Sequence, residues 1–266
     1  MLRIARRGDR HDPRDLNVAV RLEGAYDAAF LEGRQDGVIP GETLKNIVHA
    51  GARAHGASEI EELGLALSRQ IVERQPRLSR VRVEIAEKRW LRLEAGGKPQ
   101  AQTFLAGTDE QRLAIVTTNG QQTSVVAGVS GLTVMRTSGF TSGTLATNDP
   151  DGVYDGEQPL VVGTLSARWT YTTGDVTFGV YRQGVRAAVL DTFAWHRSQS
   201  VHHALHAVAN VVLSTYEEIA DVTLAFHERP YRPADLFAAG AENPNELFVV
   251  VDEPIGVVEV TVERNR

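Results

Sequence analysis

Three histidines at helical spacing are the residues of this chain best placed to do chemistry. His202, His203 and His206 lie in the stretch SVHHALHAVANVVL, residues 200–213. Apolar residues recur there at steps of three and four, which predicts a helix with one buried face. His202 and His206 are four residues apart, so the helix places them on the same face. The two imidazoles could bind a metal ion, with Glu228 or His227 as a third ligand, or could line a pocket. We expect the pocket and no metal ion.

The bulk composition excludes several classes of protein. The chain has 266 residues, which suits one large domain or two of about 130 residues. Its net charge of −6 argues against nucleic-acid binding. The absence of cysteine excludes disulfides, thiolate catalysis and cysteine-bound metal clusters. No apolar run reaches the roughly 20 residues needed to span a bilayer, and the first residues lack the apolar region of a signal peptide. We therefore expect a cytoplasmic protein with no membrane partner.

Apolar periodicity predicts two similar sets of helices and strands, which must position the histidines. The first set lies in the first half of the chain. It comprises strands at residues 2–5 and 16–24, helices at 43–55 and 58–75, and strands at 81–93 and 103–118. We expect the first two strands to pair across a turn at His11, Asp12 and Pro13. Ser58 as N-cap, with Glu61 three residues later, predicts a capping box for the second helix.

The same order returns in the second half of the chain. It comprises strands at residues 124–136 and 164–172, helices at 185–195 and 200–219, and strands at 221–226 and 247–262. A repeated β-β-α-α-β-β order predicts a duplicated fold with units at 1–122 and 123–266. Antiparallel hairpins with helices on one face make the fold class α+β. Open sheet edges need cover, which an oligomer could supply by closing the sheets into a barrel.

Several short motifs stand in order along nearly the whole chain. They are Glu42-Thr43-Leu44-Lys45-Asn46, Glu61-Glu62-Leu63-Gly64-Leu65-Ala66-Leu67, Trp90 with Gly97-Lys98-Pro99 and Phe104, Ser130-Gly131-Leu132-Thr133-Val134, Ser138-Gly139-Phe140, Ser200-Val201, Asn243-Pro244-Asn245-Glu246-Leu247-Phe248 and Asp252-Glu253-Pro254-Ile255-Gly256. This series resembles the uricase (urate oxidase) family. The resemblance implies tandem tunnelling-fold units, assembled as a homotetramer whose active sites lie at subunit interfaces.

The resemblance also implies a reaction. Uricases oxidise urate with O2 to 5-hydroxyisourate and hydrogen peroxide, without a metal or organic cofactor. The chemistry needs a proton relay, an arginine and a glutamine that hold the purine, a phenylalanine that stacks on it, and an asparagine above the ring. For this chain it implies a planar, purine-like heterocycle and O2 as substrates and no cofactor.

Most of the family's relay positions carry other residues here. Gly41 stands at the position of the relay threonine, and Glu42 replaces the aspartate that follows it. The family's histidine falls on Pro230 and its asparagine on Glu228. The relay lysine has no counterpart before Leu2.

The groups that hold the purine are also changed. His202 takes the position of the glutamine, and Gln158-Pro159-Leu160 stands where the arginine is expected. The stacking position keeps Phe140, which either stacks on a ligand or only packs in the core. The backbone of Val201 also matches. The missing arginine could be replaced by one from the helices, namely Arg182, Arg186 or Arg197, although exposed helix arginines are usually solvated.

These changes lead to two functional hypotheses. In the first, the chain is a uricase-like, cofactor-independent oxidoreductase with an altered substrate, in which Phe140, Val201 and His202 bind the ligand. His202 and Glu228 are then the catalytic candidates, with Glu228 as a new general base. In the second, Glu228 is only a loop carboxylate beside Arg229, and the chain is a degenerate homologue acting as a structural or binding partner. General acid–base and electrostatic catalysis each contribute orders of magnitude, so neither hypothesis predicts efficient urate oxidation by the family's mechanism.

The stretch at residues 139–159 is irregular and rich in Gly, Asp, Asn and Thr. A connection of this length is either a functional loop or a disordered segment.

Overall fold

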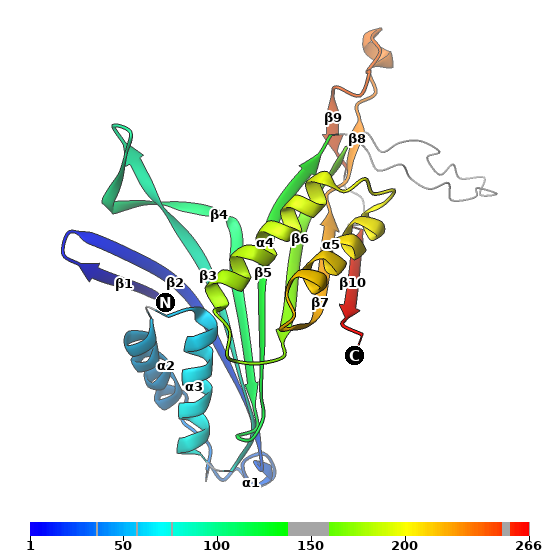
Figure 1. Ribbon diagram of the computed structural model, residues 1–266. Helices are drawn as coiled ribbons and strands as arrows, with labels where there is room; N and C mark the ends of the chain where they lie inside the picture. The colour runs from blue at the N-terminus through cyan, green and yellow to red at the C-terminus, as the bar shows by residue number, and fades with distance from the viewer. Residues whose placement is uncertain (36, 57, 76, 138–159, 252–255, 266) are drawn as a thin grey trace.

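A single antiparallel sheet organises the molecule. The computed structural model describes the whole chain except residues 36, 57, 76, 138–159, 252–255 and 266. Within the described residues, the sheet has eight strands in the order β1-β2-β3-β4-β5-β6-β7-β10. Helices α2 to α5 cover one face of it, α2 and α3 over the first half and α4 and α5 over the second (Figure 1). The fold class is therefore α+β, as predicted. None of the described helices has the length and hydropathy of a membrane span.

The main sheet comprises β1 (Leu2–Arg7), β2 (Arg10–Gly24), β3 (Leu78–Ala95), β4 (Lys98–Thr118), β5 (Thr123–Arg136), β6 (Val161–Tyr171), β7 (Ile219–Glu228) and β10 (Val257–Glu263). The helices are α1 (Asp27–Leu31), α2 (Gly41–His55), α3 (Ile60–Arg74), α4 (Phe178–Trp195) and α5 (Val201–Thr215). A small second sheet pairs β8 (Tyr231–Pro233) with β9 (Phe248–Val250), and the 3-10 helix η1 (Phe237–Ala239) lies between them in sequence.

Alternating side chains explain why the helices cover only one face of the sheet. In β3, Val81, Val83 and Ile85 are buried, whereas Arg82 and Glu84 between them remain partly exposed. Successive side chains of a strand point to opposite faces, so one face is apolar and the other is not. Burying each of these aliphatic side chains contributes about 1.5–3 kcal/mol.

The core has two parts that follow the two halves of the chain. One part joins α2 and α3 to β2 and β3, through residues such as Ile47, Leu63 and Val83. The other joins α4 and α5 to β5, β6 and β7, through residues such as Leu205 and Trp169. The described elements repeat the order β-β-α-α-β-β, with α1 inserted in the first half and β8 and β9 in the second. The division into units at 1–122 and 123–266 stays a proposal.

The sheet has two open edges. β1 pairs only with residues 10–15 of β2, and the backbone of Met1 also bonds to Leu16. From Asn17 to Gly24, β2 has a single neighbour within the described part of the chain, which is β3. At the other end β10 pairs only with β7 in that same part. Both edges leave backbone donors and acceptors available to a further strand.

The predicted turn at His11, Asp12 and Pro13 is wrong. These three residues lie within β2 and pair with β1, and the chain reverses at Gly8 and Asp9 instead. Gly8 has a φ of 58°, a left-handed conformation that only glycine adopts without steric cost. Pro13 is tolerated in the strand because β3 pairs with β2 only from Asp15 onward.

The predicted capping box is shifted by one residue. Glu59, not Ser58, is the N-cap of α3, and the Glu62 carboxylate accepts a hydrogen bond of 3.1 Å from the Glu59 backbone N–H. Glu61, predicted to close the box, is instead completely buried. The apolar stripe of α3, which includes Ile60 and Leu63, turns Glu61 toward the core.

Two predicted elements of the second half have other bounds. α4 begins at Phe178, seven residues before the predicted start. The prediction missed the first two turns because Arg182 interrupts the apolar pattern of the buried face. The strand predicted at 247–262 is wrong as a single element, since β9 and β10 belong to different sheets. Apolar periodicity does not record which sheet a strand joins. The predicted loop at 139–159 lies outside the described residues.

Gly163 of β6 provides a test of this packing. A Cβ atom at Gly163 would lie 2.2 Å from the Phe226 ring and 2.6 Å from the His227 carbonyl oxygen. We expect Gly163→Ala to lower the free energy of unfolding by about 1–3 kcal/mol, measured by urea denaturation at fixed protein concentration. The matched control is Gly174→Ala, where a Cβ would meet no atom within 4 Å. Equal stability of the two variants would contradict the packing.

Candidate functional site

The first turn of α5 positions the predicted ligand-binding residues of the second half. Ser200 is the N-cap, and its hydroxyl accepts a hydrogen bond of 3.2 Å from the His203 backbone N–H. Leu205 and Val208 are fully buried in the core, as the periodicity predicted. His202 therefore falls on the exposed side of the helix, and Val201 is partly buried at its start.

The histidines of α5 do not converge on one point. The Nδ1 atom of His206 lies 3.2 Å from the Asn210 side-chain nitrogen, one turn further along the exposed face. The His203 ring packs edge-on against His196, with 5.0 Å between the ring centroids. No group of three or more His, Asp or Glu side chains that could hold a metal ion occurs among the described residues. The three imidazoles therefore lie separately on the exposed side of α5.

His196 lies in the segment between α4 and α5. The Nδ1 atom of His196 is 2.6 Å from the hydroxyl of Ser198, which is buried. Arg136, at the end of β5, donates a hydrogen bond of 3.2 Å to the His196 carbonyl oxygen. These contacts stabilise the segment between α4 and α5, and they place Arg136 beside His196.

Glu228 ends β7, where the main sheet meets the arm that carries β8 and β9. It pairs with Gly163 of β6, and its backbone N–H donates to the Gly256 carbonyl oxygen at 2.9 Å. Its side chain is partly exposed, so it could meet a ligand. Pro230 lies beyond the strand, and its carbonyl oxygen accepts a hydrogen bond of 3.2 Å from Val251. Arg229 is held by its backbone N–H, which donates to Val162.

Gly41 and Glu42 begin α2 in the first half. Both are exposed, and Glu42 forms an ion pair of 2.6 Å with Lys45 one turn along the helix. Gly41 borders a cavity of about 270 Å³ between α2 and β2, which Asn17 and His49 also line. Gly41 has no side chain, so this position cannot relay a proton as a hydroxyl would.

The two groups of predicted residues lie far apart within one chain. α2, with Gly41, and α5, with His202, are separated in the helical layer by α3 and α4 (Figure 1). A site that uses both would need the α2 of one chain and the α5 of another. Phe140 and the segment Gln158-Pro159 lie outside the described residues.

The arginines proposed as replacements have other partners. Arg182 is only 4% exposed and forms a hydrogen-bonded ion pair with Glu59. Arg186 binds Glu110 through two bonds of 2.7 Å. Arg197 is exposed. The expectation that these side chains form a solvated helix face is therefore wrong for Arg182.

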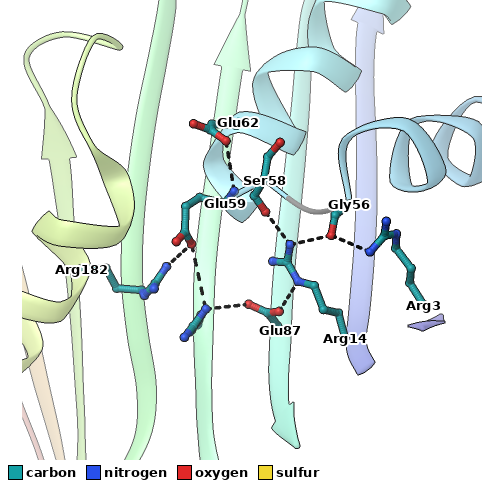
Figure 2. A network of polar contacts seen from close by, with 9 residues as sticks. Arg3, Arg14, Gly56, Ser58, Glu59, Glu62, Glu87 and Arg182 are labelled. Carbon is teal, nitrogen blue, oxygen red and sulfur yellow. Dashed lines mark hydrogen bonds and ion pairs between the residues drawn. The ribbon is translucent and has the colours of Figure 1, made fainter. Parts of the chain in front are cut away.

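The Arg182–Glu59 pair belongs to a charged network beneath the N-terminus of α3 (Figure 2). Arg112 lies 3.3 Å from Glu87 and 4.0 Å from Glu59, and Arg14 is 2.5 Å from Glu87. Burial raises the pKa of Glu59, but the Arg182 hydrogen bond and the charges of three arginines outweigh it, so the pKa is lowered overall. The network connects α4 of the second half with α3, β2, β3 and β4 of the first.

A sequence model described as Uricase matches residues 6–117 and 125–259. This chain belongs to the uricase family. A uricase of Arthrobacter globiformis is 28% identical over 264 residues, which cover 99% of this chain and 86% of that protein. A uricase of Dictyostelium discoideum is 26% identical over 259 residues, covering 96% of this chain and 90% of that protein.

The fold matches that of solved uricases. The crystal structure of the Arthrobacter globiformis uricase superposes with a TM-score of 0.91 at 28% identity, covering 99% of this chain and 90% of that one. A uricase structure from Bacillus fastidious has a TM-score of 0.81 at 17% identity, covering 94% and 82%, which shows the fold alone. The predicted family is thus confirmed. The assignment of individual uricase site positions to Gly41, Glu42, Val201, His202, Glu228 and Pro230 stays a prediction.

Sequence reasoning missed the inward-facing charges of α3 and α4. A signal was present, because Arg182 precedes Val185 and Val189 at helical spacing and therefore shares their buried face. Glu61 likewise precedes Gly64 and Ser68, both of which lie on the buried face of α3.

Removing the Arg182 side chain should strongly destabilise the protein. Arg182→Ala leaves the Glu59 carboxylate, whose side chain is 32% exposed, without its closest cation. Breaking a buried ion pair from one side costs about 3–5 kcal/mol, and we expect the lower end because Glu59 is partly solvated. Urea denaturation at fixed protein concentration measures the loss.

The matched control for this variant is Arg197→Ala, an exposed arginine just beyond α4. We expect that control to change stability by no more than about 0.5 kcal/mol. A similarly small effect of Arg182→Ala would show that the pair does not hold the two halves together.

Proposed function

We propose that this chain is a uricase-like, cofactor-independent oxidoreductase that acts on a planar heterocycle related to urate. The family match over nearly the whole chain, with its complete sheet and helical layer, is the observation that carries the proposal. The family reaction consumes urate, O2 and water and yields 5-hydroxyisourate and hydrogen peroxide. The altered residues at the relay and ligand positions support a changed substrate rather than urate itself.

The ligand would lie against the start of α5. The backbone of Val201 and the imidazole of His202 would face it, with Phe140 stacking on its plane. A neutral imidazole both donates and accepts a hydrogen bond, which differs from the paired donor and acceptor of a glutamine amide. An imidazole would therefore bind a heterocycle whose edge carries a different pattern of donors and acceptors.

Proton removal from the heterocycle would fall to a carboxylate. Glu228 is partly exposed at the end of β7, and a carboxylate beside apolar strands can serve as a general base. Deprotonation makes the ring more electron-rich and therefore more reactive toward O2. His202 would then hold the ring in place or take part in the same proton transfer.

The site would be completed by a second copy of the chain. α2, which begins with Gly41 and Glu42, lies at the opposite end of the helical layer from α5, which carries His202 (Figure 1). The open edges of β2 and β10 would allow two chains to join their sheets into a barrel. We therefore propose a homo-oligomer, and a tetramer by the resemblance to the family.

The first test measures urate oxidation directly. Purified protein is incubated with urate and O2, while loss of urate absorbance and release of hydrogen peroxide are followed. We expect turnover at least about a hundredfold below that of the Arthrobacter globiformis uricase assayed alongside, because relay and ligand-holding groups are each worth such factors. Turnover comparable to that enzyme would show that the proposed replacements do not disable the family mechanism.

The second test locates the ligand. A thermal-shift screen of urate, xanthine and a pterin should find a compound that raises the melting temperature of the natural chain. We expect His202→Ala to abolish this shift and His202→Gln, which restores the family's residue, to increase the shift produced by urate. His55→Gln, an exposed histidine at the other end of α2 from Gly41, is the control and should change nothing.

The alternative function is that of a non-catalytic partner subunit. The observation that favours it is the glycine at the relay position of α2, since no side chain there can transfer a proton. This alternative predicts that no heterocycle shifts the melting temperature and that no compound is turned over. It further predicts that the chain forms mixed oligomers when produced together with an active uricase.

A further inference from the structure

Three polar side chains lie in the interior without a hydrogen-bond partner. Both carboxyl oxygens of Glu61, the indole Nε1 of Trp169 and the hydroxyl of Tyr171 make no hydrogen bond to any residue that the structure describes. Glu61 and Trp169 are 0% exposed and Tyr171 is 5% exposed. More than nine in ten buried polar groups in proteins are paired, so three unpaired ones in one region need an explanation.

These three side chains face a common region between the two halves of the chain. Trp169 and Tyr171 are two residues apart on β6, so both point to the helix-covered face. Glu61 lies in the first turn of α3. Burial raises the pKa of Tyr171, the nearby Trp169 indole N–H lowers it and the charge of Glu61 raises it further, so both groups lie close to the phenol. Leu65, one turn further along α3, packs against the same core cluster as Trp169.

The surroundings of this region are mainly apolar and aromatic. The Tyr171 ring packs edge-on against Phe178 at 5.2 Å and Tyr181 at 5.8 Å. The charged groups that shift the pKa of Glu61 are Arg182 of α4, Glu59 at the N-cap of α3 and Arg112 of β4. Both Arg182 and Arg112 already contact Glu59 or Glu87, so neither is committed to Glu61.

We propose that Glu61, Trp169 and Tyr171 form an internal site that binds ordered water and takes up one proton, between α3 of the first half and β6 of the second. An indole N–H, a phenol and a carboxyl group together supply donors and acceptors for a water molecule, which usually makes about three hydrogen bonds when buried. The site is separate from the first turn of α5 and does not rest on the proposed function.

The proton follows from the burial of a carboxyl group without a committed cation. Burial raises the pKa of Glu61 to about 7, against the smaller lowering effects of its backbone and of Arg182. In the unfolded chain a glutamate titrates near 4.3. The folded protein therefore binds more protons than the unfolded chain between these values, so its stability falls as pH rises through this range. The contribution is fully present below about pH 4 and is lost above about pH 7.

Replacing Glu61 by its neutral isostere tests the proton. We expect Glu61→Gln to raise the melting temperature relative to the natural chain more at pH 8 than at pH 5, by about 5 °C. The control is Glu73→Gln, an exposed glutamate on the same helix, which should show no such pH dependence. A difference between Glu61→Gln and the natural chain that is the same at both pH values would overturn the proton uptake.

A second measurement does not require the Glu61 variant to fold. The exposed tryptophans are removed in a Trp90→Phe, Trp195→Phe chain, which leaves Trp169 as the only fluorophore of its kind. Its emission should change with a midpoint near pH 7. Tyr171→Phe should move that midpoint upward, because the water that solvates the carboxylate loses one of its hydrogen-bond partners. Emission that stays constant between pH 5 and 9 would contradict the proposal.

The water is tested by a high-resolution crystal structure of the natural chain at pH 6. We expect solvent density at about 2.6–3.2 Å from a Glu61 oxygen and from Trp169 Nε1 or Tyr171 Oη. A dry region, or a direct hydrogen bond from Glu61 to either ring, would overturn the water site.

Discussion

The ion pair between the buried Arg182 and the partly exposed Glu59 is the charged contact that joins the two halves of the chain. Arg182 comes from α4 and Glu59 caps α3, so one bond joins helices that belong to separate parts of the core. Two charges taken out of water are costly unless each is closely partnered. The network in Figure 2 supplies those partners, since Arg112 and Arg14 neutralise Glu87 beside the same pair. The halves are thus joined by charge as well as by the continuous sheet.

The uricase fold of this chain depends on residues other than those at the predicted site positions. The fold rests on the alternating strands, the apolar faces of four helices and the internal ion pairs, and the exposed side chain of His202 and the exposed Gly41 belong to none of these. Gly41, His202 and Pro230 lie at exposed or partly exposed positions, where a change of residue has little effect on packing. A fold of this kind does not fix the function, because function depends on the individual residues of a site.

Much of the fold was predictable because apolar periodicity reports burial. The buried face predicted for α5, with Leu205 and Val208, is confirmed. Errors arose where polar residues face inward. Arg182 interrupts the apolar pattern of α4, so the prediction missed the first turns of that helix. Glu61 was predicted to be a capping residue, although it lies in the core. A single sequence does not show which distant charge will partner such a residue.

The candidate site was less predictable than the fold. The sequence predicted His202 near the start of a helix, which the structure confirms. Glu228 was expected in a loop after a strand at 221–226, but it is the last residue of β7. The structure does not bring Gly41 toward them, because α3 and α4 lie between α2 and α5 in the helical layer (Figure 1). The polar side chains that contact His196, namely Ser198 and Arg136, come from a loop and a strand end whose approach depends on the whole sheet.

The two open edges of the sheet have a consequence for how the protein exists at low concentration. From Asn17 to Gly24, β2 presents backbone groups that no described strand satisfies, and β10 does the same at the opposite end. If another copy satisfies them, association and folding share one equilibrium, and the midpoint of unfolding moves with protein concentration. Dilution would then act on this chain as a denaturant does.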